Sequence, residues 1–208
     1  MFGKAIVFIT SEDQGDKRLL VLGHPNAGIQ IPKGTIDENE SPLQAALREG
    51  SEETGLTDLV CSSHIITENL SLKEDQRYIV SETSVYSRPD KRSFDWAHLR
   101  RGIRVNVRQK NKNYTQIEYL EYEDISVRKT ISYQIIGWVP NEKISREYIR
   151  SYYHLTTKTE KENWKNFDDN HEFELHWIDI EGTSKLLDSH EIWVDEIFIP
   201  YIKKISEK

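Results

Sequence analysis

The segment over residues 34–56, GTIDENESPLQAALREGSEETGL, constrains this chain more than any other feature, because it predicts one helix with both ends marked. Ser41 is a favourable N-cap, and a glutamine three residues later completes a capping box with it. Pro42 suits the first helical position. Gly55 is a natural left-handed C-cap. We therefore expect a helix over residues 42–54.

The predicted helix carries a cluster of carboxylates beside its apolar face. The positions that follow the spacing of a buried face are Leu43, Ala46, Leu47 and Gly50. Glu49, Glu52 and Glu53 project together from the flank of that face, because residues three and four apart are neighbours on a helix. Like charges at this spacing repel one another by a few tenths of a kcal/mol per pair, and Arg48 is their one local partner.

A divalent cation would relieve this repulsion, since carboxylate oxygens are ligands that Mg²⁺ and Mn²⁺ prefer. The alternative is a solvated acidic face, which is the usual interpretation for an arbitrary pair of glutamates. That alternative does not explain why Gly34, Glu40 and Gly55 stand at set offsets from the carboxylates. We therefore favour a metal site.

The whole segment resembles the Nudix box, G-x5-E-x7-R-E-U-x-E-E-x-G-U, in which U is an aliphatic residue. The fixed positions are occupied by Gly34, Glu40, Arg48, Glu49, Glu52, Glu53, Gly55 and Leu56. One aliphatic position departs from the pattern, where Gly50 stands; we expect a cost in packing and helix propensity of about 1 kcal/mol, without loss of metal ligands. The box covers 23 of the 208 residues, and a looser similarity extends over 1–85 and 127–208.

Resemblance to the Nudix family implies an α/β/α sandwich with a mixed β-sheet between helices, and the alternation of strand-like segments with two marked helices favours the same α/β class. We expect a single Nudix domain over residues 1–208, with an insertion or extended hairpin over 88–126. The predicted strands are 4–10, 18–23, 28–32, 59–67, 78–86, 131–139 and 174–180. Further helices are predicted over 142–153 and from 183 onward, and a loop over 158–170.

The resemblance also implies a function, the Mg²⁺- or Mn²⁺-dependent hydrolysis of a phosphoanhydride bond in a nucleoside diphosphate linked to another group. Such cleavage needs charge neutralisation, an activated water and positioning. A carboxylate-bound cation neutralises charge and lowers the pKa of its water. We predict that Glu49, Glu52 and Glu53 are the metal ligands, and the resemblance implies that Glu49 and Glu53 are the most central. Arg48 should orient these carboxylates.

The general base and the substrate contacts are less constrained. In the family the base is sometimes a box glutamate and sometimes a glutamate in a later loop. Glu172 and Glu174, in HEFELHW, lie in the region that resembles that loop; the alternative is that they are ordinary surface glutamates. The resemblance implies that the backbone carbonyl of Lys33 completes the metal coordination, and its ammonium could contact a phosphate.

The tripeptide Pro32-Lys33-Gly34 resembles Nudix branches that hydrolyse dinucleoside polyphosphates and diphosphoinositol polyphosphates. It therefore favours dinucleoside polyphosphates as substrates.

Residues 88–112 are basic, with nine Lys and Arg against two Asp, in a chain whose net charge is −7. They form either a solvated surface paired with the acidic stretch that follows, or an electropositive lip that gathers polyphosphate or an RNA end. The second interpretation leaves two other functions open, an RNA 5′-end pyrophosphohydrolase and a non-catalytic nucleotide- or RNA-binding module. Degraded box carboxylates, the usual mark of such a module, are absent from this sequence.

Composition narrows the class of protein further. Charged residues make up 30% and hydrophobic residues 37% of the chain, as in soluble globular proteins. No apolar run reaches transmembrane length, and the first ten residues are too short for a signal peptide. Cys61 is the single cysteine, which rules out an internal disulfide and favours a reducing compartment. We expect a cytoplasmic protein without membrane contacts, with a homodimer among the alternatives for its assembly.

Overall fold

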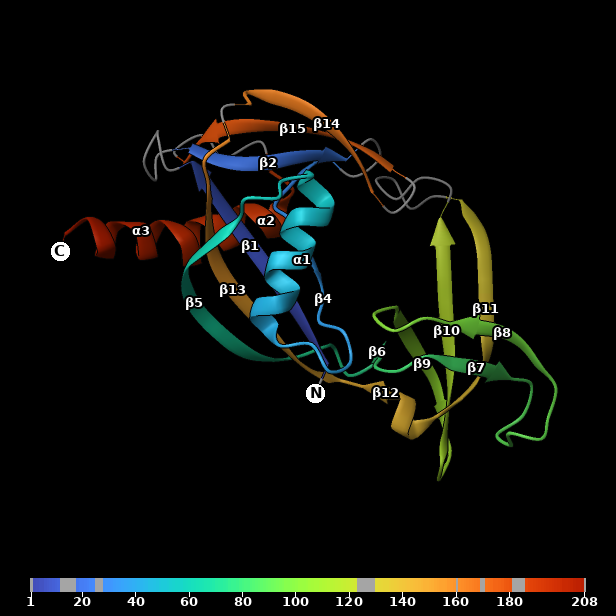
Figure 1. The fold of residues 1–208 in the computed structure, drawn as a ribbon. Coiled ribbons are helices and arrows are strands. Elements are labelled where there is room, and N and C mark those ends of the chain that lie inside the picture. Colours follow the sequence, from blue (N-terminus) through green and yellow to red (C-terminus); the bar gives the residue numbers. More distant parts are fainter. Residues whose placement is uncertain are drawn as a thin grey trace. The chain divides into compact units, whose positions relative to one another are not determined.

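The computed structural model describes residues 2–11, 18–24, 28–122, 130–159, 161–168, 171–180 and 186–207. The chain divides into two compact units (Figure 1). The first, which we call the box unit, comprises Gly3–Glu68 and Arg150–Lys208 and contains the Nudix-box segment. The second, which we call the β unit, comprises Met1–Phe2 and Asn69–Ile149.

The box unit is built on a sheet of eight strands in the order β14-β15-β2-β1-β13-β5, with β3 paired to β2 and β4 paired to β1. Its first elements are β1 (Gly3–Ser11), β2 (Arg18–His24), β3 (Gly28–Gln30), β4 (Lys33–Thr35), α1 (Pro42–Thr54) and β5 (Val60–Ser71). Its later elements are β13 (Glu147–Thr157), β14 (Asn163–Asp168), β15 (His171–Asp179), α2 (Asp188–Trp193), the π-helical turn Val194–Phe198 and α3 (Ile199–Ser206).

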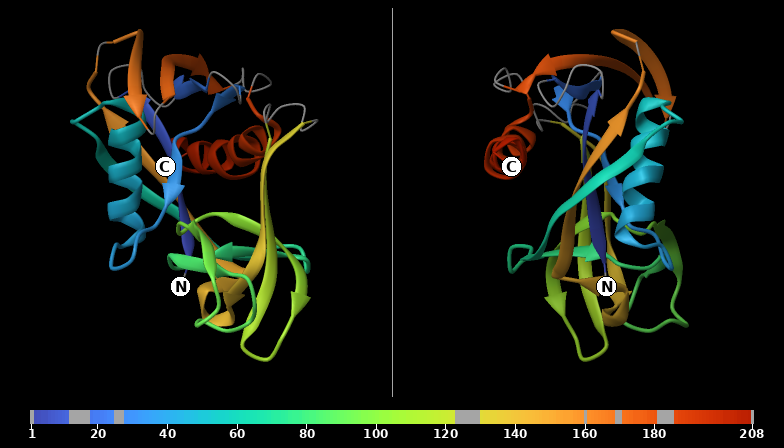
Figure 2. Two further views of the ribbon diagram at one scale, coloured as in Figure 1. Left: turned by 90° about the vertical axis from the view of Figure 1, so that its right-hand side faces the viewer. Right: turned by 60° about the vertical axis from the view of Figure 1, so that its left-hand side comes forward.

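Helices cover both faces of this sheet, with α1 on one side of β1 and the C-terminal helices on the other (Figure 2). A Cβ atom placed on Gly50 of α1 would lie 3.6 Å from the side chain of Val7 in β1. Ile6 and Phe8, which alternate with Val7, face the other way and join a buried cluster with Phe198. The rings of Phe8 and Phe198 stack with their centroids 4.6 Å apart. The predicted α/β/α sandwich is therefore confirmed.

The helix predicted over residues 42–54 is confirmed at both ends. Ser41 Oγ accepts the Gln44 amide at 3.2 Å, and Gln44 Oε1 accepts the Ser41 amide at 2.8 Å, which forms the capping box. At the other end, Gly55 adopts a φ of 71°, and its amide donates to the Ser51 carbonyl. The sequence therefore fixes both helix ends through local hydrogen bonds.

The predicted inward face of α1 is partly wrong. Its buried residues are Ala45, Ala46, Gly50 and Thr54, whereas Leu43 is 37% exposed. The buried stripe is thus rotated around the helix from the one that apolar residues alone predict. Because Glu49 and Glu53 lie within or beside the rotated stripe, this rotation brings both carboxylates toward β4.

Several strand predictions are confirmed, and three segments differ. Residues 78–86 form two short strands, β6 (Gln76–Ile79) and β7 (Thr83–Tyr86), rather than one. Residues 142–153, predicted as a helix, continue from a 3₁₀ turn at Asn141–Lys143 into β12 (Ile144–Ser145) and β13. Aromatic and β-branched side chains in this segment fit a central strand between β1 and β5. The predicted loop over 158–170 contains β14.

The β unit contains a sheet of seven strands in the order β12-β6-β9-β10-β11-β7-β8, and each neighbouring pair is antiparallel. Its remaining strands are β8 (Asp95–Leu99), β9 (Arg104–Lys110), β10 (Tyr114–Tyr122) and β11 (Ile131–Pro140). One face of the sheet buries a cluster that includes Ile79, Val105 and Ile117. The predicted insertion over 88–126 lies within the β unit, which extends beyond it on both sides. Residues 123–126 of the insertion fall outside the described residues. The organisation as a single domain with an insertion stays a prediction.

No helix in the described part of the chain has both the length and the hydropathy that crossing a membrane requires.

Candidate active site

The three predicted metal-ligating residues lie together in the box unit. Glu49, Glu52 and Glu53 of α1 line one open cleft of about 610 Å³, and Lys33 and Gly34 of β4 line it from the adjacent strand. Strand β4 is held in place by its antiparallel pairing with β1. The cleft therefore forms where α1 crosses the sheet beside β4.

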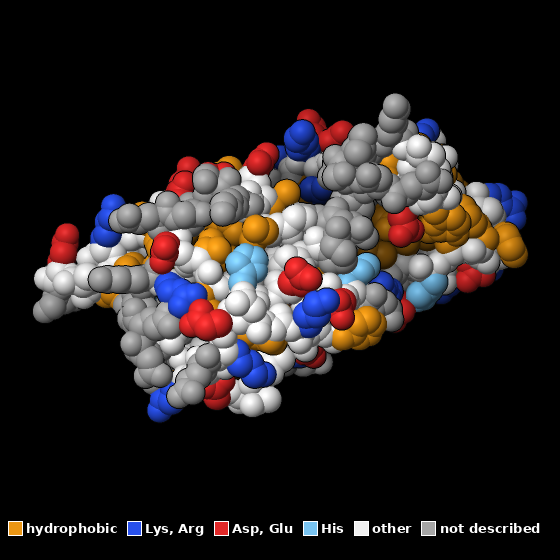
Figure 3. Space-filling model, turned by 90° about the horizontal axis from the view of Figure 1, so that it is seen from above, with side chains coloured by type: hydrophobic (Ala, Val, Ile, Leu, Met, Phe, Trp, Pro, Cys, Tyr) orange, Lys and Arg blue, Asp and Glu red, His pale blue; other side chains and the backbone are white. Residues whose placement is uncertain are grey.

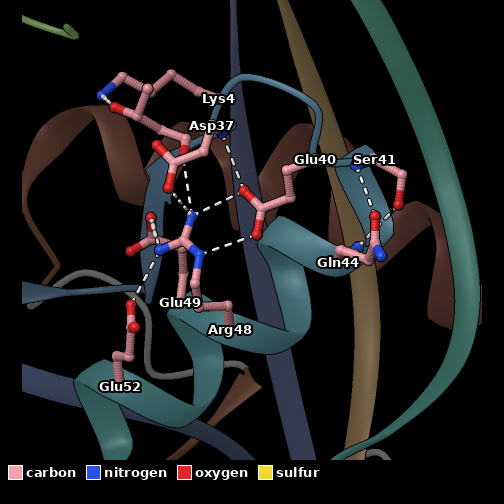
Figure 4. A network of polar contacts seen from close by, with 9 residues as sticks. Lys4, Asp37, Glu40, Ser41, Gln44, Arg48, Glu49 and Glu52 are labelled. Carbon is pink, nitrogen blue, oxygen red and sulfur yellow. Dashed lines mark hydrogen bonds and ion pairs between the residues drawn. The ribbon is translucent and has the colours of Figure 1, made fainter.

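Arg48 organises the carboxylates on the solvent side of α1 (Figure 4). Its guanidinium bonds both oxygens of Glu40 at 2.9 Å, Glu49 Oε1 at 2.8 Å and Glu52 Oε2 at 2.9 Å. These charge-assisted bonds raise the pKa of Arg48, and the bond from Arg48 lowers the pKa of Glu40. Arg48 therefore neutralises much of the repulsion that the sequence implies.

Glu40 braces the loop that leads into α1. Its Oε2 accepts the amide of Asp37 at 2.9 Å as well as the bond from Arg48. Arg48 Nη2 also donates to the Thr35 carbonyl at 3.0 Å, at the end of β4. The loop, the strand and the helix are thus tied to one guanidinium, and Glu40 is not among the residues that line the cleft.

Gly34 allows the close approach of β4 to the Glu49 carboxylate. A Cβ atom on Gly34 would lie only 1.7 Å from Glu49 Cδ, which no real side chain tolerates. The Glu49 side chain is 14% exposed, and burial raises the pKa of Glu49 despite the opposing bond from Arg48. A glycine at position 34 is therefore a steric requirement of this carboxylate position.

Glu53 is the most desolvated of the three carboxylates. Its Oε2 accepts the backbone amide of Lys33 at 2.9 Å. Burial raises the pKa of Glu53 to about 7, although the Lys33 charge and amide oppose the rise. Burial also lowers the pKa of Lys33, whose ammonium donates to Gln30 Oε1 at 2.7 Å. A charged Glu53 is thus poorly compensated by the protein alone.

Strand β14 contributes a site residue that sequence reasoning missed. Trp164 Nε1 donates to the Thr54 carbonyl at 2.7 Å, and Asn166 Nδ2 donates to the Glu52 carbonyl at 2.6 Å. These two side chains satisfy carbonyls at the C-terminal end of α1. Asp168 follows at the same alternation and lines the cleft, where its charge contributes to the raised pKa of Glu53. The alternation of Trp164, Asn166 and Asp168 in the sequence is the pattern that could have predicted a strand here.

Glu172 and Glu174, the two predicted candidates for the general base, are not among the residues that line the carboxylate cleft. They line a second cavity of about 420 Å³ together with Gly23, which pairs with Glu174 across β2 and β15, and with His24, which also lines the carboxylate cleft. Lys165 Nζ contacts Glu172 at 2.6 Å and Glu174 at 3.7 Å, and both glutamates are exposed. Because side chains alternate along a strand, these positions face away from the residues of β15 that line the carboxylate cleft.

Three rings also line that cleft. His24 of β2 and His171 and Phe173 of β15 all line it. The centroid of His24 lies 4.8 Å from that of His171 and 5.5 Å from that of Phe173. Burial, with the charges of His171 and Lys33, lowers the pKa of His24, which favours a neutral imidazole. The cleft is thus lined by both acidic side chains and aromatic rings, and Asp168 pairs with His171 across β14 and β15.

The C-terminal helices fix the segment that leads into β4. His190 of α2 is buried, and its Nδ1 accepts the Ile31 amide at 2.8 Å. Burial lowers the pKa of His190 to about 3, so the ring is neutral and can accept this bond. The Leu187 amide donates to the Ile29 carbonyl at 2.9 Å. These bonds hold the chain on the N-terminal side of Lys33.

Comparison with known proteins identifies the family. The model of the NUDIX domain matches residues 1–141, well over half of the chain. The chain belongs to the Nudix family. This assignment agrees with the box, whose every fixed residue is present in this Nudix protein.

Of the two individual relatives, one matches this Nudix protein over a short segment and the other matches along the whole chain with low identity. It is 49% identical over 47 residues to an RNA pyrophosphohydrolase of Bartonella henselae, which covers 21% of this chain and 27% of that relative. Among solved structures it resembles the E. coli dihydroneopterin triphosphate pyrophosphohydrolase, with 14% identity, 95% of each chain covered and a TM-score of 0.42. That likeness is too low to establish a shared fold by itself.

The chemistry of the carboxylates in this Nudix protein fits a divalent cation. Glu49, Glu52 and Glu53 supply hard oxygen donors to one cleft, and a cation would offset the cost of an ionised Glu53. Within the described residues, no three His, Cys, Asp or Glu side chains converge closely enough to hold a metal ion. In this arrangement Arg48 bonds Glu49 and Glu52, while Glu53 bonds the Lys33 amide.

The basic stretch 88–112 lies in the β unit, and part of its charge is compensated there. Arg92 pairs with Asp90 at 3.0 Å, Arg108 pairs with Glu118, and Arg101 lies over the Phe2 ring. The pair with Glu118 agrees with the interpretation that acidic residues after the stretch balance it. The acidic stretch after residue 112 consists of Glu118, Glu121, Glu123 and Asp124, and the last two lie outside the described residues. In the view from above, Lys and Arg are interspersed with Asp and Glu on the described surface (Figure 3).

Proposed function

We propose that this Nudix protein is a divalent-metal-dependent hydrolase that cleaves a phosphoanhydride bond in a nucleoside diphosphate linked to another group. The observation that carries the proposal is that Glu49, Glu52 and Glu53 share one cleft with Asp168 and Lys33. Desolvation there leaves Glu53 with a pKa of about 7 in the protein alone. Such a site favours a cation that compensates the carboxylates, and Mg²⁺ or Mn²⁺ suits oxygen donors of this kind.

In this proposal the residues have separate tasks. Glu49 and Glu53 are the central metal ligands, Glu52 assists them, and the Lys33 carbonyl completes the set. A bound Mg²⁺ would neutralise phosphate oxygens and lower the pKa of a bound water. The Lys33 ammonium, held in the cleft by Gln30, contacts a phosphate. Arg48 positions Glu49 and Glu52 through its charge-assisted bonds.

For the general base, we propose a residue other than the two later-loop glutamates predicted from sequence. Asp168 lines the carboxylate cleft, whereas Glu172 and Glu174 line the cavity beside Gly23. A base must reach the attacking water directly or through one further water. We therefore propose Asp168 or a box glutamate for this role.

Two substrate classes remain supported by separate observations. Pro32-Lys33-Gly34 favours dinucleoside polyphosphates. The local similarity to an RNA pyrophosphohydrolase supports an RNA 5′ end as the second candidate. Residues 69–149 carry 15 Lys and Arg against 11 Asp and Glu, so the β unit is positive while the rest of the chain is strongly negative. That charge would serve backbone contacts to RNA.

The test is a hydrolysis panel with Mg²⁺ and recorded product masses, containing diadenosine polyphosphates, nucleoside triphosphates, ADP-ribose, NADH, diphosphoinositol phosphates and 5′-triphosphate RNA. Glu53→Gln serves as the blank. Glu174→Gln is the matched control, because it removes an exposed carboxylate that does not line the carboxylate cleft. Turnover that the blank loses and the control keeps supports the enzyme; no turnover on any compound refutes it.

A second comparison separates the two substrate classes. If the RNA end is the substrate, Lys110→Ala should slow hydrolysis of 5′-triphosphate RNA and leave a diadenosine polyphosphate unaffected, with strong salt dependence of the RNA reaction alone. Lys203→Ala, at an exposed position of α3, is the control. Tight RNA binding without turnover, unchanged by Glu53→Gln, would instead indicate a non-catalytic binding module.

A further inference from the structure

The hairpin of β7 and β8 in the β unit exposes two aromatic side chains (Figure 1). Phe94, in the turn that joins the two strands, is 72% exposed, and Trp96 of β8 is 41% exposed. Strand β8 ends the order of the seven-stranded sheet, so it is an edge strand among the described residues. Single exposed hydrophobic residues are normal on a protein surface, but two aromatic rings this close together at a sheet edge indicate an interaction surface.

Short-range hydrogen bonds hold the turn in one conformation. The Ser87 amide donates to the Phe94 carbonyl at 2.8 Å, which extends the pairing of β7 and β8 by one bond. The Ser93 side chain is buried, and its hydroxyl donates to the Asp90 carbonyl at 2.7 Å and accepts the Arg88 amide at 3.3 Å. A surface that is ordered before binding loses less conformational entropy when a ligand arrives.

A β-bulge sets the position of the second ring. The pairing register shifts between Val85 and Tyr86 of β7, so Trp96 is the extra residue of the bulge in β8. Bulges bend a strand and re-aim a side chain. Here the indole reaches toward β11, where a Cβ atom on Gly137 would lie 3.6 Å from Trp96 Nε1. The ring is therefore held against its neighbours while part of it stays open to solvent.

The same segment is positively charged. Residues 87–101 contain five Lys and Arg against two Asp. Arg92 pairs with Asp90 at 3.0 Å, and Arg101 Nη1 donates to the Val80 carbonyl. Three of the five are exposed and make no ion pair with a described residue, namely Arg88, Lys91 and Arg100. The two rings thus lie among positive charges that the described part of the protein does not balance.

Exposed rings among uncompensated cations suit a polyanion that carries flat rings of its own. In single-stranded nucleic acid the bases can stack on aromatic side chains while the phosphates meet Lys and Arg, whereas a duplex keeps its bases stacked on one another. A second copy of the hairpin would bring the same positive charge, and the two copies would repel each other. Charge complementarity therefore favours a nucleic-acid strand over self-association.

We propose that the β7–β8 hairpin, residues 87–100, is a binding site for single-stranded RNA. Bases stack on Phe94 and Trp96, and the three exposed cations contact phosphates. The inference rests on the RNA candidate of the proposed function and deepens it by assigning the RNA strand to named residues of the β unit. Neither ring lines the carboxylate cleft, so the hairpin binds RNA that carries no phosphoanhydride bond as well.

The test measures the affinity of the full chain for a fluorescent oligouridylate with a 5′-hydroxyl, by fluorescence anisotropy in EDTA. A strand of about eight nucleotides falls within the length that one single-strand site covers. Phe94→Ala should weaken binding by roughly 5- to 150-fold, the range for loss of one base–aromatic stack. Phe94→Tyr keeps a ring and should retain the wild-type affinity.

Inorganic polyphosphate separates stacking from charge, because it offers phosphates without bases. Phe94→Ala should leave the affinity for polyphosphate within about 2-fold of wild type. Lys91→Ala should weaken both ligands and lower the salt slope of RNA binding by about 0.7, the value for one phosphate contact to a single strand. Phe167→Ala removes a 70% exposed ring of β14 in the box unit and should change neither ligand.

Several results would overturn the site. Wild-type RNA affinity in Phe94→Ala, or equal weakening of RNA and polyphosphate in that variant, would exclude stacking. Duplex RNA bound as tightly as the single strand would do the same, and tighter binding of DNA of the matching sequence would refute the assignment to RNA. Absence of RNA binding, with a dimer that Phe94→Ala abolishes, would instead show a contact between copies of this chain.

Failure of this inference and failure of the proposed function are distinguishable, because the RNA probe is bound without metal and without turnover. Hydrolysis of a diadenosine polyphosphate in the panel, without RNA binding that depends on Phe94, would remove the RNA site and leave the enzyme. RNA binding that depends on Phe94, without hydrolysis of any compound, would keep the RNA site and remove the enzyme.

Discussion

Replacing Glu53 by glutamine should stabilise the metal-free protein in a pH-dependent manner. Glutamine keeps an oxygen that can accept the Lys33 amide, now 2.9 Å from Glu53 Oε2, but it removes the carboxylate charge. In the folded protein burial raises the pKa of Glu53 from 4.5 to about 7, and this value already includes the opposing attraction of Lys33. The ionised carboxylate is therefore a cost that the variant does not carry.

The sign and size of the effect follow from proton linkage. Because the folded pKa lies above the unfolded one, the folded wild-type protein binds more protons between about pH 4.5 and 7, and its free energy of unfolding falls across that window. Each tenfold change in proton affinity is worth about 1.4 kcal/mol, so the upper bound is about 3 kcal/mol. Partial exposure of Glu53 reduces this to about 1–3 kcal/mol.

The assay is urea unfolding of both proteins in EDTA at pH 5 and pH 8. Tryptophan fluorescence is a suitable signal, since Trp164 bonds the end of α1. We expect Glu53→Gln to gain about 1–3 kcal/mol relative to wild type between pH 5 and pH 8. Added Mg²⁺ at pH 8 should stabilise only the wild-type protein. An equal difference between the two proteins at both pH values would refute the reasoning.

Three other predictions test neighbouring parts of the account. Gly34→Ala should fold but lower the rate of hydrolysis by about 100-fold, because the new Cβ displaces the Glu49 carboxylate. The control Gly23→Ala, whose new Cβ would lie 3.4 Å from its nearest neighbour, should keep the wild-type rate. Equal rates of hydrolysis in the two variants would contradict the steric argument. Asp168→Asn should lower the rate by about 100-fold with little change in thermal stability, and an unchanged rate would exclude Asp168 as the base. Ser41→Ala should lower the free energy of unfolding by about 1 kcal/mol in urea titrations, since it removes the N-cap, and no change would show that Pro42 alone suffices.

Local signals account for what the sequence predicts well. Ser41 and Gln44 bond each other's amides, and Gly55 takes the left-handed conformation, so the ends of α1 depend on residues within the helix itself. The same helix carries Glu49, Glu52 and Glu53 on adjacent turns. Their presence in one cleft follows from helical geometry and can be expected before any tertiary contact is known.

Tertiary contacts decide what the sequence predicts poorly. Residues 163–168 read as a polar loop, but they pair with β15, and Trp164 and Asn166 bond the end of α1. Asp168 reaches the cleft only because of that pairing. By the same alternation Glu172 lines the other cavity, since neighbours along a strand face opposite sides. The register of one strand pair thus determines which acidic residue enters the site.

The central claim is most directly tested by the rate of phosphoanhydride hydrolysis in Mg²⁺ for wild type, Glu49→Gln, Glu53→Gln and the control Glu174→Gln. The account predicts that the first two variants each lose at least about 100-fold in turnover, as expected for removal of a metal ligand or base, while the control keeps the wild-type rate. Near-normal turnover in both Glu49→Gln and Glu53→Gln would contradict the assigned site.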